Sequence, residues 1–527
     1  MNSINRRTLL AGLGAAGTGL LAACGKDAHT APPLLSPHGS QVARVEKKRG
    51  ATGRVRSLNV TAAPATLDLG GGVLTRSWAF GGQVPGKEIR ISAGDTLDAE
   101  LSNQLPDATT TSIHWHGISL RSDMDGVPPI TQDPVRAGSS FTYRFVADEP
   151  GTYFFHPHVG LQTDRALYAP LIVEDPKEPL SYDDEWVVVL DDWLDGVTGT
   201  PDDVFTELGH SMPGMDMKGT DSSRPESSRH PSASASPSPS ASSADGTSPR
   251  FRLGGSASPL LGRDAGDVNY PYHLINGRVP TDPAVYDGTP RRRVRLRIIN
   301  AGADTAYRVA LGGHKLTVTH TDGFPVDHQE VDALLVAMGE RYDALVTLDD
   351  GVFPFVALAE GKDVTGMALV RTGSGGLPDP AVRPPELNGR TVTAGELRAS
   401  DAVRLEAKDP DQVLRVRLTG DMGTYDWGIN GKRFDMAAPA SDPLLVREGQ
   451  RVRLDFINTT NMWHPMHLHG HTYQLGDTGP RKDTTVVLPK SKVSVVFDAD
   501  NPGQWMLHCH NAYHSEAGMM ALVAYEA

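Results

Sequence analysis

Short runs in which hydrophobic and polar residues alternate follow one another along most of the chain. Residues 142–145, 187–190 and 493–497 are clear examples, and Gly, Pro, Asn and Asp interrupt the chain between such runs. The sequence shows no long helical periodicity. Short strands bounded by turn residues are typical of β-sandwiches and β-barrels. From about residue 54 onward, the pattern therefore predicts an all-β fold.

Two segments recur along the chain, and their recurrence predicts several related domains. A strand that ends in Asn occurs three times, at 94–103, 293–300 and 449–458. An aromatic strand that leads into two histidines occurs at 150–158 and 502–510, whereas its counterpart at 351–358 has no histidine. We therefore predict three related β-domains, with metal chemistry in the first and third only. Their predicted bounds are 54–178, 179–376 and 377–527.

The N-terminal residues have the features of an export signal, which we place at 1–24. Arg6 and Arg7 form a twin-arginine start, and the apolar run at 9–23 is too short to span a membrane comfortably. The run ends in Leu-Ala-Ala-Cys at Cys24, which has the form of a lipobox. We expect twin-arginine export and a lipid on Cys24 that anchors the protein to the outer face of the cell membrane. An ordinary signal peptide cut elsewhere is the alternative. Residues 25–53 are predicted to be a polar linker.

The second domain contains an insertion at about 208–260. Residues 221–258 are rich in Ser, Pro and Ala, a composition that predicts disorder. Just before this stretch, three methionines stand close together, at Met212, Met215 and Met217.

Composition narrows the possible functions. The chain has 527 residues, 39% of them hydrophobic and 22% charged, so it can form several sizeable cores. Its formal net charge of -14 argues against nucleic acid as a partner. There are two cysteines, Cys24 and Cys509. If Cys24 carries a lipid, Cys509 has no disulfide partner, and its place between two histidines suggests metal ligation. Nothing indicates dimerisation, so we expect a monomer.

Four histidine motifs carry the candidate chemistry. They are His114-Trp115-His116-Gly117, His156-Pro157-His158, His464-Pro465-Met466-His467-Leu468-His469, and His508-Cys509-His510 followed by His514 and Met519. On a strand, residues i and i+2 point to the same face. Each motif therefore presents two imidazoles together, while Cys509 points away from its two histidine neighbours. One short segment can thus give a thiolate to one metal and imidazoles to others.

The ligands outside these pairs are His464, Cys509, His514 and Met519. Two imidazoles, a thiolate and a weakly bound thioether form the ligand set of a blue-copper electron-transfer site. Zinc is the obvious rival for a site of His and Cys. Zinc does not explain eight paired imidazoles or a Met ten residues after the Cys.

These motifs resemble those of the three-domain multicopper oxidases, the laccase and copper-resistance group built from cupredoxin domains. The nearest likeness is to the actinobacterial lipoprotein oxidases of copper tolerance, on the motifs at 123–126, 319–323, 340–343 and 425–431. The resemblance covers essentially the whole mature chain. It implies three cupredoxin-like Greek-key β-barrel domains and four copper ions. It also implies an enzyme that takes single electrons from a substrate and reduces O2 to water.

The resemblance assigns a role to each ligand. His464, Cys509 and His514 look like type 1 copper ligands with Met519 axial, and His114 and His467 look like type 2 ligands. His116, His156 and His510 would bind one type 3 copper, and His158, His469 and His508 the other. The three-copper cluster would lie between the first and third domains, with the second domain as a spacer. Electrons would pass from the type 1 copper through Cys509 to this cluster.

Two carboxylates are candidates for proton transfer, because water formation consumes protons. Asp125 follows the first motif where similar oxidases keep an acid near the cluster, so we expect it to donate protons and orient the type 2 water. A simple turn residue is the alternative. Similar oxidases often have Glu directly after the last type 1 His. This chain has Ser515 there, and Glu516 is the nearest carboxylate.

The reduced substrate stays open at this stage. Cu(I) is favoured because thioethers prefer Cu(I) and because of the three clustered methionines. Met462 lies where a related oxidase has a substrate-copper ligand, although Thr460 replaces the accompanying acid. Phenols or aromatic amines, as in laccases, and Fe(II) are alternatives. A copper-sequestering protein without turnover is a further alternative, which the complete set of cluster motifs disfavours.

Overall fold

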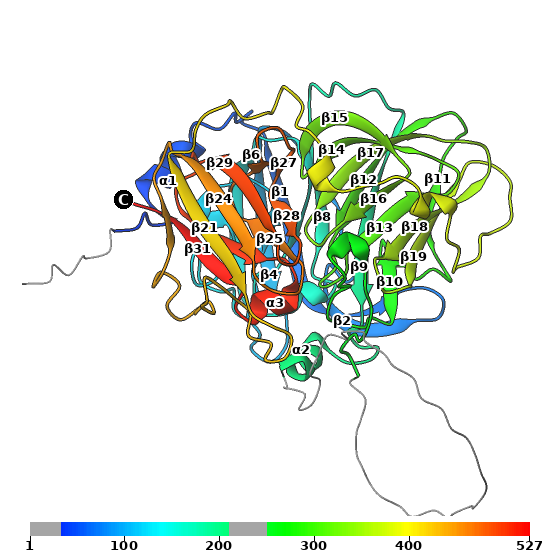
Figure 1. Ribbon diagram of the computed structural model, residues 1–527, viewed down its shortest axis with the longest axis horizontal. Coiled ribbons are helices and arrows are strands. Elements are labelled where there is room, and N and C mark those ends of the chain that lie inside the picture. Colours follow the sequence, from blue (N-terminus) through cyan, green and yellow to red (C-terminus); the bar gives the residue numbers. More distant parts are fainter. Residues whose placement is uncertain (1–32, 210–249) are drawn as a thin grey trace, which may run out of the picture.

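The computed structural model describes residues 33–209 and 250–527. The predicted signal with Cys24, and the methionines Met212, Met215 and Met217, lie outside the described residues. The described chain is built from β-sheets that form three pairs in sequence order, each pair stacked as a sandwich (Figure 1). This arrangement confirms the predicted all-β fold.

The first sandwich has two four-stranded sheets, in the orders β2-β1-β4-β6 and β3-β8-β7-β5. Its strands are β1 (Val55–Asp68), β2 (Leu74–Phe80), β3 (Ile89–Ser92), β4 (Asp95–Asn103), β5 (His114–His116), β6 (Ser140–Ala147), β7 (Gly151–His156) and β8 (Ala169–Glu174). In β4 the alternation in the sequence becomes alternation in burial, with Leu97, Ala99 and Leu101 fully buried. A short helix, α1 (Ser40–Glu46), precedes the sandwich.

The second sandwich has two six-stranded sheets, in the orders β10-β9-β12-β17-β14-β15 and β11-β19-β18-β13-β16-β20. Its strands are β9 (Asp184–Trp193), β10 (Tyr272–Ile275), β11 (Ala284–Asp287), β12 (Arg293–Asn300), β13 (Tyr307–Leu311), β14 (Leu316–Thr321), β15 (Phe324–Val331), β16 (Ala333–Val336), β17 (Arg341–Thr347), β18 (Val352–Ala359), β19 (Thr365–Arg371) and β20 (Thr391–Val392). Helix α2 (Pro201–Gly209) follows β9.

The third sandwich pairs a six-stranded sheet, β22-β21-β24-β29-β26-β27, with a five-stranded sheet, β23-β31-β30-β25-β28. Its strands are β21 (Gln412–Thr419), β22 (Gly428–Ile429), β23 (Leu444–Val446), β24 (Arg451–Asn458), β25 (His464–Leu468), β26 (Tyr473–Leu475), β27 (Arg481–Lys482), β28 (Thr484–Val487), β29 (Lys492–Asp498), β30 (Gln504–Cys509) and β31 (Met520–Tyr525). Helix α3 (Ala512–Glu516) lies between the last two strands.

The Asn that ends the repeated strand has the same role in all three sandwiches. Asn103, Asn300 and Asn458 each donate from Nδ2 to two or three main-chain carbonyls of neighbouring segments. Each also accepts, at Oδ1, the main-chain N–H two residues later. Buried backbone groups need such partners. The repeat in the sequence therefore marks a repeated turn that one buried amide side chain satisfies.

Three segments differ from what the sequence predicts. Residues 25–53 were predicted to be a polar linker, whereas Ser40–Glu46 form helix α1, and Leu35 and Val42 are buried. Residues 385–399 lie beyond the predicted end of the second domain, yet β20 pairs with β16, and Leu387 and Leu397 are buried against the second sandwich. Predicted disorder reached to about residue 258, whereas Phe251 and Ser258 are buried. Phe251 packs in the same apolar cluster as α2 and the third sandwich, which explains why this polar stretch is ordered at its end.

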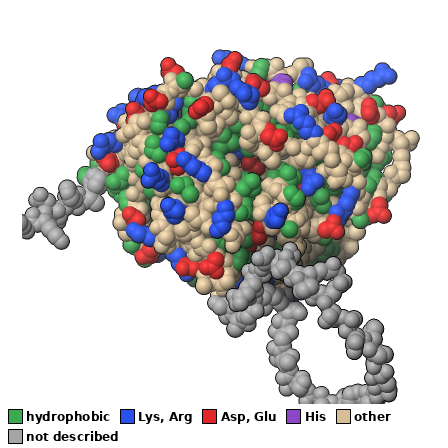
Figure 2. Space-filling model, in the orientation of Figure 1, with side chains coloured by type: hydrophobic (Ala, Val, Ile, Leu, Met, Phe, Trp, Pro, Cys, Tyr) green, Lys and Arg blue, Asp and Glu red, His purple; other side chains and the backbone are tan. Residues whose placement is uncertain are grey.

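The surface of the protein mixes both signs of charge. Figure 2 shows basic and acidic side chains interspersed over the face in view, without one large field of either sign. Within residues 33–209 and 250–527, no helix has the length and apolar character needed to cross a membrane.

Candidate metal centre

Strand pairing brings the four histidine motifs together. In the first sandwich His114 lies opposite His156 in the β5–β7 ladder, and in the third His467 lies opposite His508 in the β25–β30 ladder. Residues directly opposite each other in an antiparallel ladder point to the same face. The alternation inferred from the sequence therefore holds in three dimensions.

The two sandwiches meet through stacked imidazoles. The rings of His114 and His469 stack with centroids 3.7 Å apart, and those of His116 and His467 stack at 3.8 Å. In each pair one ring comes from the first sandwich and one from the third. The candidate centre thus lies between these two sandwiches.

Several imidazole nitrogens at this centre are buried with no hydrogen-bond partner. They are Nδ1 of His116, Nε2 of His156 and both ring nitrogens of His510. Burial, together with the neighbouring histidines, lowers the pKa of all three imidazoles well below 6.5. Neutral imidazoles with a free lone pair are metal ligands, and buried polar atoms are normally satisfied. These residues therefore fit a bound metal ion.

Three further histidines form a second group beside the first. Nε2 of His469 lies 3.1 Å from Nε2 of His508, and the ligand atoms of His158, His469 and His508 all lie within 4.8 Å of one another. The last two paired histidines, His114 and His467, also lie close together, with their Nε2 atoms 3.4 Å apart. All eight paired histidines thus converge in one region.

A separate site lies on the opposite face of β30. The Sγ atom of Cys509 is 3.7 Å from Nδ1 of His464 and 3.6 Å from Nδ1 of His514, and these two nitrogens are 3.1 Å apart. Cys509 is a buried free thiol. Asn511 caps α3 by accepting the N–H groups of Tyr513 and His514, which fixes the position of His514. Three potential ligand atoms at this spacing suit one copper ion.

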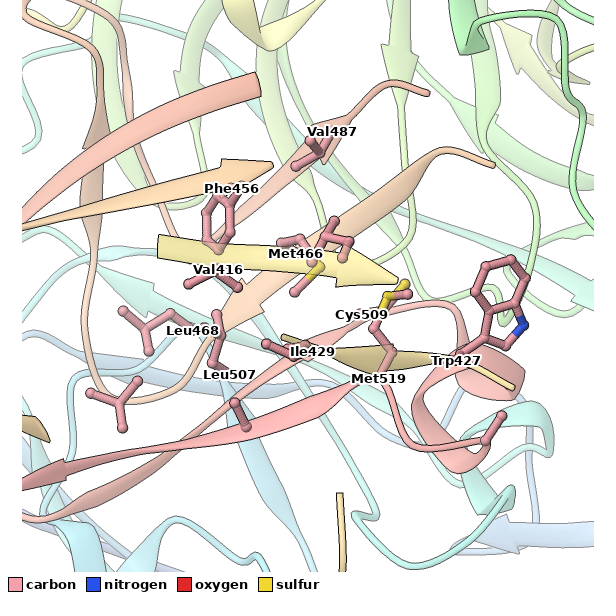
Figure 3. Close-up of a cluster of buried hydrophobic side chains, with 14 of the residues drawn as sticks. Val416, Trp427, Ile429, Phe456, Met466, Leu468, Val487, Leu507, Cys509 and Met519 are labelled. Carbon is pink, nitrogen blue, oxygen red and sulfur yellow. The ribbon is translucent and has the colours of Figure 1, made fainter. Parts of the chain in front are cut away.

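Met519 and Trp427 complete the surroundings of the thiol. Both side chains are fully buried in the hydrophobic cluster that contains Cys509 (Figure 3). The Trp427 ring lies 4.4 Å from the His514 ring and 5.3 Å from that of His464. Neither imidazole is exposed, so a substrate cannot touch the ligands directly.

Comparison with known proteins decides the family. Residues 61–178, 260–374 and 407–527 each match a family model described as multicopper oxidase. The chain is also 45% identical to Multicopper oxidase MmcO of Mycobacterium tuberculosis, across 99% of this chain and 96% of that protein. The chain belongs to the multicopper oxidase family. The family implies copper cofactors, and the buried histidines and Cys509 have the chemistry to bind copper.

More distant relatives of this multicopper oxidase have several names. The Copper resistance protein A homolog of Pseudomonas syringae is 27% identical, over 89% of this chain and 92% of its own length. Laccase-1 of Cryptococcus neoformans is 28% identical, over 90% of this chain and 80% of its own length. In structure, Fet3p, described as a multicopper oxidase that functions in iron import, superposes with a TM-score of 0.71 at 20% identity, covering 90% of this chain and 91% of Fet3p. That likeness supports the cupredoxin fold.

Asp125, the predicted proton donor, lies in direct contact with the histidine cluster. Its Oδ2 accepts a hydrogen bond of 2.9 Å from Nδ1 of His469. Its Oδ1 lies 3.2 Å from Nδ1 of His114, which also donates to the main-chain oxygen of Asp125. Asp125 is fully buried. Asp125 therefore orients two imidazoles, His469 through its carboxylate and His114 through its main-chain oxygen.

Glu516 and Met462, the other candidates of the sequence analysis, lie in contrasting places. Glu516 is exposed and lines a cavity of about 320 Å³ that reaches His158 and His508. Met462 is only 5% exposed and packs in the core near His464. The structure thus places Glu516 on a path from solvent to the cluster, and it covers Met462 with protein.

The sequence analysis did not predict the residues that hydrogen-bond to the second ring nitrogen of these imidazoles. Asp267 Oδ2 accepts a 2.9 Å hydrogen bond from Nε2 of His514, and Thr460 Oγ1 lies 2.8 Å from Nε2 of His464. Burial alone would lower the pKa of His514, but Asp267 and Cys509 raise it to about 10. Asp483 contacts two further histidines, His116 and His467. Asp267 lies 247 positions from His514 and Asp483 lies 367 positions from His116, and no local pattern marks either carboxylate.

Proposed function

We propose that this multicopper oxidase oxidises Cu(I) to Cu(II) and couples four such one-electron steps to the reduction of O2 to water. The proposal includes four copper ions. His464, Cys509, His514 and Met519 would bind the type 1 copper, and His114 and His467 the type 2 copper. His116, His156 and His510 would bind one type 3 copper, and His158, His469 and His508 the other. When bound, the coppers supply the one-electron chemistry and the site of O2 reduction.

The chain itself supplies the path and the protons. Cys509 is bonded through the backbone to His508 and His510, so one covalent segment joins the two sites. The cavity beside His158 gives a small molecule such as O2 access to the cluster. Asp125 is placed to deliver protons on one side, and Glu516 on the side of the cavity.

The observation that carries Cu(I) as the substrate is the negative charge beside the type 1 imidazole. Asp267 accepts from His514, and the carboxylates of Asp264 and Asp304 lie close enough to Asp267 for burial and mutual repulsion to raise the pKa of Asp264 to about 7. Lys362 neutralises Asp304 through a 2.6 Å contact. Carboxylates beside the electron-accepting ligand favour a cationic reductant over a neutral phenol. Relatives named copper resistance protein A also support Cu(I) as the substrate.

The three clustered methionines remain a prediction. Both flanks of segment 210–249 are held at one place, because Glu207 Oε1 accepts 2.8 Å hydrogen bonds from the N–H groups of Phe251 and Arg252. The ring of Phe205 in α2 lies 6.4 Å from that of Tyr425, which lies 6.1 Å from the ring of His514. Helix α2, which ends at Gly209, therefore lies near the proposed type 1 site, and this supports a role of the methionines in Cu(I) capture.

Oxygen uptake by copper-loaded protein tests the function, with Cu(I) and a phenol supplied in separate runs. We expect the higher kcat/KM with Cu(I). Replacing Met212, Met215 and Met217 with Leu should slow Cu(I) oxidation and leave phenol oxidation unchanged. Uptake with the phenol alone would identify a laccase, uptake with Fe(II) alone a ferroxidase, and no uptake with any of the three would leave a copper-binding protein. Unchanged rates in the triple variant would remove the methionines from the proposal.

We also propose that the protein is exported by the twin-arginine route and is held at the outer face of the cell membrane by a lipid on Cys24, as a monomer. The proposal rests on the sequence of residues 1–24. Cell fractionation of Cys24→Ala tests it, because this variant should move from the membrane fraction to the soluble exported fraction. Membrane association that persists in the variant would contradict the lipid anchor. Sedimentation of the detergent-solubilised protein tests the monomer.

A further inference from the structure

The second sandwich contacts the histidine cluster directly and is more than the spacer that the sequence suggested. Gly339 lies in the turn between β16 and β17 and has a φ of +81°. A Cβ atom at this position would lie 2.9 Å from Cδ2 of His510 and 3.1 Å from Cε1 of His116. The backbone of this turn therefore packs against two imidazoles of the cluster.

Arg341, two residues later, links all three sandwiches. Its Nη1 and Nη2 donate to Oδ1 and Oδ2 of Asp483 in the third sandwich, at 2.7 and 2.6 Å. Its Nε donates to the main-chain oxygen of Thr152 in the first sandwich, and Nη1 also donates to that of Gly339. Arg341 and Asp483 are both fully buried. A planar guanidinium that pairs through both forks fixes the plane of the carboxylate as well as its position.

Asp483 in turn holds both imidazoles of one stacked pair, His116 from the first sandwich and His467 from the third. Its Oδ1 accepts from Nε2 of His116 at 3.1 Å, and its main-chain oxygen accepts from Nδ1 of His467 at 3.0 Å. The hydroxyl of Thr484 lies within 3.2 Å of both nitrogens and donates to the same carboxylate oxygen. Because the proton of His116 is held at Nε2, the lone pair is left at Nδ1, and this is the nitrogen that lacks any partner.

We propose that Arg341 and Asp483 are positioning residues for the three-copper cluster. Through Asp483, the second sandwich fixes the orientation of His116 and His467, which belong to different copper sites. The inference rests on the copper ligands proposed above. Asp483 acts through the imidazoles and is not itself a ligand, since Arg341 occupies both of its carboxylate oxygens.

Arg341→Lys in the full, copper-loaded chain tests the proposal. Lysine keeps the positive charge but cannot make the two parallel hydrogen bonds of a guanidinium, so the plane of the Asp483 carboxylate is no longer fixed. Partners that orient a metal-ligating His typically contribute about 10–100-fold in metal affinity. We expect the type 2 electron paramagnetic resonance signal to change and a chelator to remove copper from the cluster about 10–100-fold more readily. The blue absorption of the type 1 copper should be unchanged.

Arg308→Lys is the matched control. Arg308 also makes a two-pronged ion pair in the second sandwich, with Glu360 at 2.8 and 2.7 Å. Arg308 is partly buried and Glu360 is buried, and Glu360 contacts no histidine of the cluster among the described residues. Thr484→Val offers a milder change, because it removes one hydroxyl at constant size. It should shift the same type 2 signal even if Arg341→Lys does not fold.

The outcomes separate this inference from the proposed function. If the unmodified protein lacked a type 2 signal or bound fewer than four copper ions, the copper assignment would fail. Suppose instead that the unmodified protein has a type 2 signal and binds four copper ions. If Arg341→Lys and Thr484→Val then keep that signal and the copper affinity, and only the melting temperature falls, as in Arg308→Lys, the ion pair is purely structural. That result would overturn the positioning role.

Discussion

Asp125 and Asp483 occupy equivalent places on two neighbouring pairs of stacked imidazoles. Asp125 contacts His114 and His469, whose rings stack at 3.7 Å, and Asp483 contacts His116 and His467, whose rings stack at 3.8 Å. The two carboxylates differ in their own partners. Burial alone would raise the pKa of Asp483, but Arg341 and the hydrogen bonds from its histidines hold it well below its usual range. Among the described residues, no Lys or Arg pairs with Asp125. Asp483 is therefore suited to orientation alone, and Asp125 to proton transfer as well.

Replacing Asp125 with Asn should separate electron entry from O2 reduction. The amide cannot donate a carboxylic proton, and general acid catalysis is typically worth about 100-fold or more. We expect rapid anaerobic bleaching of the type 1 copper by substrate, followed by reoxidation with O2 that is about 100-fold slower. Stopped-flow absorption measures both steps.

Asp125→Glu is the control for this prediction, because it retains an acid. It should recover part of the reoxidation rate, and the pH dependence of that rate should differ between the two variants. Equal reoxidation rates in Asp125→Asn and the unmodified protein would show that the protons come from elsewhere.

Local sequence patterns were enough to predict which histidines lie together, whereas the residues that support them through long-range contacts could not be predicted. Residues such as His508, Cys509 and His510 reveal their arrangement through the two-residue period of a strand, which needs no knowledge of the rest of the fold. The Arg341–Asp483 pair spans 142 positions and the His514–Asp267 pair spans 247. The sequence analysis noted Glu-Arg-Tyr-Asp at 340–343 as a motif, but neither composition nor spacing indicated its partner. The same limit explains why the second domain was expected to be only a spacer.

Gly117→Ala should damage the cluster through a collision. Gly117 follows His116 with a φ of +86°, and a Cβ atom there would lie 2.3 Å from Nη2 of Arg341. Left-handed backbone at a non-glycine residue costs about 1–2 kcal/mol, and displacement of the ion pair should add to this cost. We expect a lower melting temperature together with a changed type 2 signal.

Gly72→Ala distinguishes these two effects. Gly72 has nearly the same φ, +83°, but a Cβ atom there meets nothing within 4 Å. This control should lose stability only by the backbone cost and should keep the type 2 signal. Identical spectra in both variants would contradict a role for close packing at Gly117.

Cu(I) oxidation should accelerate as the pH rises through about 7. Burial and the neighbouring Asp267 and Asp304 raise the pKa of Asp264 to about 7, so this carboxyl is neutral below that pH and negative above it. A negative Asp264 beside the electron-entry site attracts a cationic substrate, with an effect of about fivefold on kcat/KM for a gain of about 1 kcal/mol. Initial rates across this range, with Cu(I) and with a neutral phenol, measure the difference.

Asp264→Asn should abolish this rise for Cu(I) and leave the phenol profile unchanged. Asp379→Asn, which removes an exposed carboxylate from the segment after β19, is the control and should keep the rise. A pH profile that is the same in Asp264→Asn and the unmodified protein would mean that another group controls the binding of the cation.

Two fully buried methionines near Cys509 allow the axial ligand to be tested by a matched pair of substitutions. Met466 lies directly opposite Cys509 in the β25–β30 ladder, and Met519 follows α3; both are 0% exposed. Figure 3 shows both in the cluster around the thiol. If Met519 is the axial ligand, Met519→Leu removes a weak thioether donor and should raise the reduction potential of the type 1 copper. Met466→Leu changes a similar volume and should leave the potential unchanged, because Leu for Met in a core usually costs less than about 1.5 kcal/mol and alters no ligand. Redox titration of the blue absorption gives both potentials. A rise in Met466→Leu alone would transfer the axial role to Met466, and no rise in either would show that neither thioether tunes this copper.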